Sequence, residues 1–243
     1  MKHHVSTILS VAFGVFFYIA LAYFGLSFWW IFLAFLPLGY IQLYATNRYN
    51  FRSTVQLEPI PESGYEKRIA GLDANQNALA GLGFTKIDEF YLRVSPDTVA
   101  YSYRHEQYPI TLVDYDMQAA KFCDMVTQFD NGYTLTTTNG QNAGVVPLPE
   151  NRLGQQFPRA GFADLLHAHL DAGQFLHERG FQPSRLQSEI YRQSFLEHFH
   201  EAGNYMKSPL SPIKLLYRMA TNEKKRYARP IRQQHLANTI RLP

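Results

Sequence analysis

A stretch of 45 residues near the start of the chain, from His3 to Asn47, contains no Asp, Glu, Lys or Arg. It is almost wholly apolar between Val5 and Tyr44. As one helix, that length would extend about 60 Å, roughly twice the thickness of a bilayer core. Two spans fit if the chain reverses near Gly25, where glycine and serine permit a tight turn. We therefore predict a two-helix transmembrane hairpin within residues 1–50.

The predicted spans are about Val5–Phe24 and about Phe28–Tyr44. Each is close to the shortest helix that crosses a bilayer, about 17 residues. A shallower re-entrant hairpin is therefore the alternative. A cleaved signal peptide is excluded, because its apolar core ends after about 7–15 residues and this one continues far beyond that length.

Flanking charge predicts the orientation of the hairpin. Lys2 precedes the first span, Arg48 and Arg52 follow the second, and the turn is uncharged. Because positive residues stay in the cytoplasm, we expect both termini on the cytoplasmic side of the inner (plasma) membrane. The aromatic residues expected at the two membrane interfaces are Trp29 and Trp30 outside, and Tyr40 and Tyr44 inside.

Small residues recur on one face of the first span, at Ser6, Ser10 and Gly14. Such a face lets a second helix approach closely, either within the hairpin or on another membrane protein. The spans contain no Asp, Glu, Lys or Arg, so they offer no obvious proton or ion pathway.

A linker is predicted at residues 51–66 and a cytosolic α+β domain at 67–206. A helix between Tyr65 and Gly83 precedes a region in which apolar residues alternate with polar ones. This alternation predicts a four- or five-stranded antiparallel meander. Its clearest part is a strand over Lys121–Phe129, followed by the hairpin turn Asp130-Asn131-Gly132 and a returning strand over Tyr133–Thr138. The prolines between 147 and 158 predict a loop that leaves the sheet.

Helical periodicity returns after the sheet region. Helices are predicted at about 162–180, from an entry at Pro183-Ser184 to about 203, and at about 213–222. The cytosolic part is large enough for one domain, and we expect these C-terminal helices to cover one face of the sheet.

Positive charge is concentrated at the C-terminus. Residues 207–243 contain nine Lys or Arg and one acid, a net charge of +8, whereas the rest of the chain carries −5. This segment is predicted to be a basic tail that is solvated, contacts anionic lipid or docks on an acidic partner. No nucleic-acid-binding module surrounds it, so specific nucleic-acid binding is not expected. The candidate lipid- or partner-binding residues are Lys224, Lys225, Arg226, Arg229 and Arg232.

Two groups of acidic and histidine side chains are candidate metal sites. Glu197 and His200 have the Glu-x-x-His spacing of di-iron bundles, but the second copy of that motif is missing. Asp114 and Asp116 share a strand face, and Asp124 lies on the next strand, so three carboxylates can bind a hard cation or share a proton. Solvated surface residues explain both patterns as well, and Cys123 is expected in the core. We therefore assign no catalytic residue, no metal site and no cofactor.

The run from Leu82 to His169 resembles uncharacterised bacterial membrane-anchored proteins. The motifs that carry the resemblance are Leu82-Gly83-Phe84, Asp130-Asn131-Gly132, Thr137-Thr138-Asn139 and Leu165-Leu166-His167-Ala168-His169. They cover about a third of the chain. No activity is assigned to those proteins, so the resemblance implies the architecture alone.

The sequence therefore predicts a membrane-anchored, non-catalytic protein whose cytosolic domain binds a partner. The partner is a membrane protein or a second copy of the chain, and the role is that of an accessory or assembly subunit of a membrane complex. The alternatives are a membrane-bound metal-dependent enzyme and a sensor of anionic lipid that acts through the basic tail.

Overall fold

The computed structural model describes residues 37, 39–42, 44–45, 56–93, 97–118, 120–141, 149–184, 188–220 and 226–242. The chain divides into two compact units, residues 1–48 and residues 49–243. Almost all of the predicted transmembrane hairpin lies outside the described residues. Among the residues that are described, no helix is both long enough and apolar enough to cross a bilayer.

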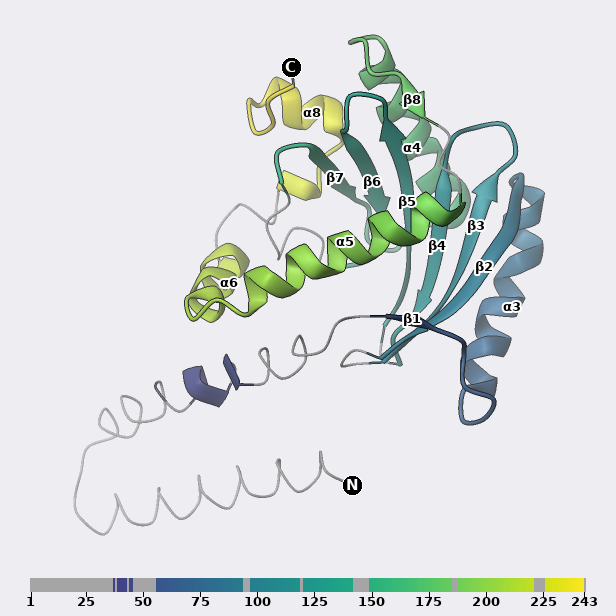
Figure 1. The fold of residues 1–243 in the computed structure, drawn as a ribbon. Helices are drawn as coiled ribbons and strands as arrows, with labels where there is room; N and C mark the ends of the chain where they lie inside the picture. The colour runs from purple at the N-terminus through teal and green to yellow at the C-terminus, as the bar shows by residue number, and fades with distance from the viewer. Residues whose placement is uncertain are drawn as a thin grey trace. The chain divides into compact units, whose positions relative to one another are not determined.

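The second unit is an α+β domain built on one eight-stranded, mostly antiparallel sheet (Figure 1). The strands are β1 (Leu57–Glu58), β2 (Phe84–Leu92), β3 (Thr98–His105), β4 (Thr111–Asp116), β5 (Lys121–Phe129), β6 (Thr134–Thr138), β7 (Arg152–Gln156) and β8 (Pro183–Ser184). The described helices of this unit are α3 (Glu66–Gly81), α4 (Phe162–His177), α5 (Ser188–Met206), α6 (Ser211–Ala220) and α8 (Ile231–Leu236).

The first six strands form an antiparallel meander in chain order, which confirms the predicted class and topology. The sheet is larger than the four or five strands expected. The sequence between 147 and 158, predicted as a loop, contains β7, which pairs in parallel with β6. Pro183-Ser184, predicted as the entry to a helix, forms the short strand β8 against the end of β5.

One face of the sheet is covered by α3 and α4, and their contacts form the main core. Leu72 and Leu79 of α3 pack on the tyrosines and leucines of β3 and β4, and Leu165 of α4 lies in the same cluster. Phe175 and Leu176 of α4 form a second cluster with Leu135 and Leu153 of β6 and β7. The alternation of buried residues along the strands explains why these side chains share a face.

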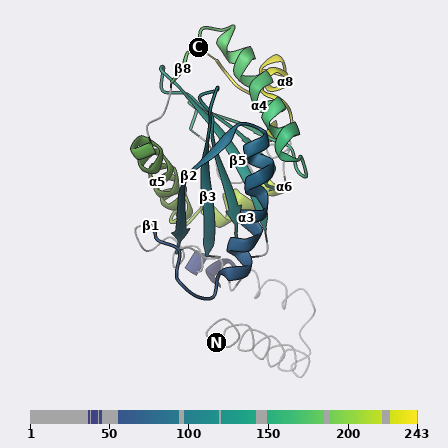
Figure 2. The same cartoon turned by 90° about the vertical axis from the view of Figure 1, so that its right-hand side faces the viewer.

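The opposite face is also covered, which the sequence did not predict. Phe195, Leu196 and Phe199 of α5 pack against a cluster that includes Phe90 of β2 and Tyr115 of β4. Figure 2 shows α3 and α5 on opposite sides of the sheet. The domain therefore has three layers, because nearly every residue of β3 and β4 is buried and both faces need cover.

The C-terminal segment from 226 to 242 folds back onto the domain. Tyr227, Ile231 and Gln234 are each at most 1% exposed. The Ile231 amide donates to Gln155 Oε1 at 3.0 Å, and Gln234 Nε2 donates to the Gly154 carbonyl oxygen at 2.8 Å. This part of the predicted basic tail is therefore a packed element that completes the edge of the sheet beside β7.

Candidate functional site

The three aspartates considered as one cation site lie on two faces of the sheet. Asp114 and Asp116 are two apart on β4, and both contact α3. Asp124 pairs across the ladder with Val113, whose side chain belongs to the α5-facing cluster. Paired residues of a sheet share a face, so the sheet separates Asp124 from the other two. The three carboxylates therefore do not form one site.

Asp116 is a structural anchor for α3. It is 2% exposed, and Arg68 Nε and Lys121 Nζ each lie 3.0 Å from its carboxylate oxygens. The Gln118 amide also donates to Oδ1, at 3.1 Å. Arg68 extends the cluster by donating from Nη1 to Asp97 at 3.0 Å. A carboxylate with this many partners is committed to holding the first turn of α3 on the sheet.

Asp97 belongs to the same cluster and accepts hydrogen bonds from two tyrosines. Tyr65 donates to Asp97 Oδ2 at 2.6 Å, and Tyr91 donates to it at 3.3 Å. Burial alone would raise the pKa of Asp97, but the hydrogen bond from Tyr65 and the charge of Arg68 hold that pKa below its usual value. The hydrogen bond to Asp97 in turn raises the pKa of Tyr65. Within the described residues, the carboxylates of Asp97 and Asp116 therefore take their hydrogen bonds and ion pairs from inside this cluster.

Asp114, on the same face of the sheet, has a carboxyl group whose pKa is strongly raised. It is 4% exposed, and its one described hydrogen-bond donor is Asn75, whose Nδ2 lies 2.7 Å from Oδ2. Burial raises the pKa of Asp114 to about 6, despite the opposing effects of Asn75 and Lys121. Tyr103, a diagonal neighbour across the β3–β4 pairing, has a buried hydroxyl without a partner among the described residues. α3 covers this group, so a substrate reaches it only if the helix moves.

Replacing Asp114 with asparagine is expected to stabilise the protein above pH 6. A carboxyl whose pKa is raised in the folded state opposes folding once it ionises, so stability is lost as pH rises from about 3.8 to about 6. The shift corresponds to about 3 kcal/mol in the free energy of unfolding at pH 8, and to no gain below pH 4. Urea unfolding of both proteins at the two pH values measures this difference. Asp171→Asn, on the exposed face of α4, is the matched control; equal effects of the two substitutions contradict the assignment.

A recess opens at the turn between β3 and β4, and a buried histidine shapes its floor. His105 Nδ1 accepts hydrogen bonds from the amides of Gln107 and Tyr108, at 3.1 and 3.2 Å. Burial lowers the pKa of His105, although the Leu82 carbonyl and Glu106 act in the other direction. Because Nδ1 accepts two backbone hydrogen bonds, it carries no proton. Gly83 has φ +82°, a backbone conformation that favours glycine, and a Cβ there would make a tight contact of 3.3 Å with the His105 ring.

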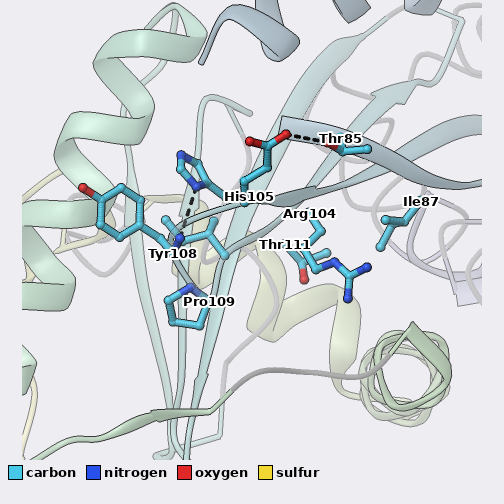
Figure 3. A pocket seen from close by; sticks show the side chains of 9 residues that line it. Thr85, Ile87, Arg104, His105, Tyr108, Pro109 and Thr111 are labelled. Atoms are coloured by element: carbon cyan, nitrogen blue, oxygen red, sulfur yellow. Dashed lines mark hydrogen bonds between the residues drawn. The ribbon is translucent and has the colours of Figure 1, made fainter. Parts of the chain in front are cut away.

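The recess has a volume of about 260 Å³, and its lining includes the rings of His105 and Tyr108 together with one cationic side chain, Arg104, and one acidic side chain, Glu106. Figure 3 shows His105 and Tyr108 on one side of it, and Arg104 with Ile87 on the other. Tyr108 is 41% exposed, and its ring lies 4.8 Å from that of His105. Thr85 donates to Glu106 at 3.1 Å across the rim. Arg104 is exposed, and no acidic residue in the described part of the chain forms an ion pair with it.

Sequence reasoning did not select this recess. Arg104 and Tyr108 stand in a Tyr-Arg-His-Glu-Gln-Tyr-Pro run that ends a strand and enters a turn, a run without a known motif. The available signal was an aromatic residue, Tyr108, directly before Pro109, with Arg104 and Glu106 four and two residues earlier in the same run. The recess itself depends on Thr85, Ile87 and Gly83 of the preceding hairpin arm, which become neighbours only through strand pairing.

A second buried histidine belongs to the core. His169 is 1% exposed, with Nε2 2.9 Å from Thr127 Oγ1 and Nδ1 2.8 Å from Thr137 Oγ1. Gln155 joins the network by donating from Nε2 to Thr137 Oγ1 and to the Ala168 carbonyl, both at 2.9 Å. Burial lowers the pKa of His169 to about 3. The group ties α4 to β5, β6 and β7, and it is closed to solvent.

The histidine and acid pairs on the helices remain surface features. Glu197 and His200 are both exposed on α5, and Glu197 accepts a hydrogen bond from Gln193 at 3.0 Å. Asp164, His167 and Asp171 are all exposed on α4. Within the described residues, no group of three or more His, Cys, Asp or Glu side chains is arranged to hold a metal ion. Cys123 is a buried free thiol, in the core as expected.

Most of the predicted membrane residues, namely Ser6, Ser10, Gly14, Trp29 and Trp30, lie outside the described residues. Tyr40 and Tyr44 are helical, and the centroids of their stacked rings lie 6.4 Å apart. Of the five predicted tail residues, Lys224 and Lys225 lie outside the described ranges. Arg226 donates to the Thr239 carbonyl and to the Tyr227 hydroxyl, and Arg232 lies over the Phe175 ring. Arg229 is exposed.

We compared the chain with models of known protein families, with curated proteins and with solved structures, and none of the three comparisons found a match.

Proposed function

We propose that this protein is a membrane-anchored, non-catalytic subunit whose folded domain binds a partner protein through the recess between β3 and β4. The anchor is the uncharged N-terminal segment of 45 residues, inserted as a hairpin with the domain on the cytoplasmic side. The partner is another component of the same membrane complex.

The observation that carries this proposal is that the buried acid and histidine side chains already have partners within the domain. Asp116 is paired with two cations, His169 with two threonines, and His105 with two backbone amides. Two exposed side chains of the recess, Arg104 and Tyr108, are by contrast of the types that dominate protein interfaces. Arginine and tyrosine are enriched among the residues that supply most of the binding energy at such interfaces.

The geometry of the recess favours a partner with a carboxylate beside an apolar side chain. Arg104 presents a planar guanidinium that can bind a carboxylate through two parallel hydrogen bonds. Tyr108 and Pro109 add a rigid apolar wall, because the Tyr108 backbone is fixed by its hydrogen bond to His105. Little conformational entropy is lost when a partner contacts such a preorganised surface.

A photocrosslinking amino acid at position 108, in the full chain in its native membrane, is expected to capture one defined protein. Arg104→Glu introduced beside it is expected to lower that yield about thirtyfold, the effect of losing a contact of about 2 kcal/mol. Arg93→Glu is the matched control, because Arg93 is 76% exposed near the other end of β2 and its charge reversal leaves the recess intact. Equal yields from the two variants, or no dominant product, contradict the proposal. Carbonate extraction of the same membranes tests the anchor separately.

A further inference from the structure

We propose that α6 is a membrane-docking helix, which lies along a bilayer surface that contains anionic lipid. This proposal rests on the proposed anchor, because the anchor places the domain beside such a surface. It assigns a second, reversible lipid contact to α6, whereas the candidate residues selected from the basic segment were Lys224, Lys225, Arg226, Arg229 and Arg232.

The exposed apolar side chains of α6 form a stripe. Leu210 and Ile213 are each 55% exposed, and Tyr217 is 64% exposed. The Lys214 amide donates to the Leu210 carbonyl at 3.0 Å, so Leu210 is already part of the helical turn. Positions three and four residues apart lie above one another on a helix, which places all three side chains on one face. These three residues are half of the large hydrophobic residues that are conspicuously exposed in the described part of the chain.

Positive charge lies directly beside the stripe. Lys214 follows Ile213, and Arg218 follows Tyr217, so a basic residue flanks each of these apolar residues on the same side. Lys207 precedes the helix and is exposed. From residue 202 to residue 222 the chain contains no Asp or Glu. An apolar stripe with basic neighbours and no acid is the composition of helices that lie in the plane of an anionic interface.

The helix is fixed to the domain while its stripe stays exposed. Ser211, at the start of α6, is fully buried, and α6 follows α5 after a short turn (Figure 1). The eleven residues between positions 44 and 56 extend at most about 40 Å. The proposed anchor therefore keeps the domain within reach of the bilayer. An anionic lipid surface complements the positive charge beside the stripe, and the proposed anchor already holds the domain near such a surface. A protein partner would need a complementary acidic face of its own.

The test uses the full chain in vesicles of phosphatidylcholine, with and without phosphatidylglycerol. Leu210→Cys carries an environment-sensitive fluorophore; the native Cys123 is buried, so a surface thiol is labelled selectively. In vesicles with phosphatidylglycerol, the label is expected to shift to the blue and to lose most of its emission to lipid-borne nitroxides. Ala78→Cys, labelled on the exposed side of α3, is the matched control and is expected to stay unquenched.

Charge removal sharpens the test. Lys207→Gln and Lys214→Gln, introduced singly, are expected to lower the ratio of docked to free helix about fivefold each, as one lysine fewer at an anionic surface predicts. Absence of quenching in vesicles from which carbonate does not extract the chain overturns the docking proposal and leaves the anchor intact. If carbonate extracts the chain from the vesicles, the anchor proposal is wrong. Docking is then decided by adding vesicles to the labelled protein: quenching supports it, and absence of quenching contradicts it. A blue shift that occurs in detergent and grows with protein concentration assigns the stripe to a second copy and overturns the proposal.

Discussion

Replacing Arg68 with methionine is expected to lower the free energy of unfolding by about 3 kcal/mol, the lower end of the range for breaking a buried ion pair. Arg68 is 13% exposed and Asp116 2%, so the loss of the guanidinium leaves a buried carboxylate with Lys121 as its remaining cation. Asp97 loses its ion pair with Arg68 at the same time. The penalty arises mainly from the desolvated charge left behind. Urea unfolding at pH 7 measures it.

The matched control is Arg93→Met. Arg93 also pairs with a carboxylate, Glu58, at 2.9 Å, but it is 76% exposed. An exposed pair contributes between zero and about 1 kcal/mol, so this variant is expected to unfold near the wild-type midpoint. Arg68→Lys keeps the charge but lacks the planar fork that contacts both Asp97 and Asp116, and it should fall between the two. Similar losses for Arg68→Met and Arg93→Met would show that burial of the Arg68 cluster has no energetic consequence.

The sequence predicted the elements whose signals are local. The alternation from Lys121 to Phe129 gave the bounds of β5, and Asp130-Asn131-Gly132 placed the following turn. The helical spacing of Leu72 and Leu79 predicted α3, and both residues are buried as that spacing requires. In each case a period and a turn residue within one window determine the element.

The elements that were missed depend on distant partners. β7 has five residues between proline-rich segments, and it is a strand because β6 offers a free edge on which it pairs in parallel. The segment from Tyr227 to Gln234 was predicted to belong to a basic C-terminal tail, because positive charge dominates the composition of residues 207–243. Its buried residues fit the edge beside Gln155 and Gly154, which no local pattern reveals. Cover of the second sheet face by α5 likewise follows from the tertiary arrangement.

The candidate sites also divide into features that a local sequence pattern predicts and features that depend on tertiary contacts. A period of two correctly placed Asp114 and Asp116 on one face of β4, but it cannot say which residue of the next strand they meet. That depends on the register, which pairs Asp114 with Cys123 and moves Asp124 to the other face. The recess at Arg104 and Tyr108 depends on the pairing of β2 with β3 and on the left-handed Gly83. Surface chemistry of this kind becomes visible only after folding.

Acidification is expected to destabilise the wild-type protein through His169 by up to about 5 kcal/mol. Its pKa is about 3 in the folded protein, against an ordinary value near 6.5 in the unfolded chain. A depressed histidine pKa means that the unfolded state binds the proton more readily. Stability from this group is therefore complete above pH 6.5 and falls as pH is lowered towards 3.

Burial lowers the pKa of His169, and the hydrogen-bond network around the ring also opposes a second proton. Thr127 donates to the Pro109 carbonyl at 3.3 Å, so its oxygen accepts from His169 Nε2. Thr137 accepts from Gln155, so its hydroxyl hydrogen is directed to His169 Nδ1. This assigns a neutral ring with the proton on Nε2. A second proton, on Nδ1, would face the hydroxyl hydrogen of Thr137 and break that bond.

His169→Gln removes the titration while retaining one donor and one acceptor, so it separates the pH effect from the loss of packing. At pH 7 the variant is expected to be less stable than wild type, by about 1–3 kcal/mol, because its amide cannot match both ring contacts. As pH falls from 6.5 to 3, wild type should lose stability relative to the variant, and the order of the two unfolding midpoints should reverse. His167→Gln, two residues away on the exposed side of α4, is the control, and its difference from wild type should stay nearly constant over the same range. A difference between wild type and His169→Gln that does not change with pH would show that His169 binds its proton equally well in the folded and unfolded chains, against the closed network that surrounds it.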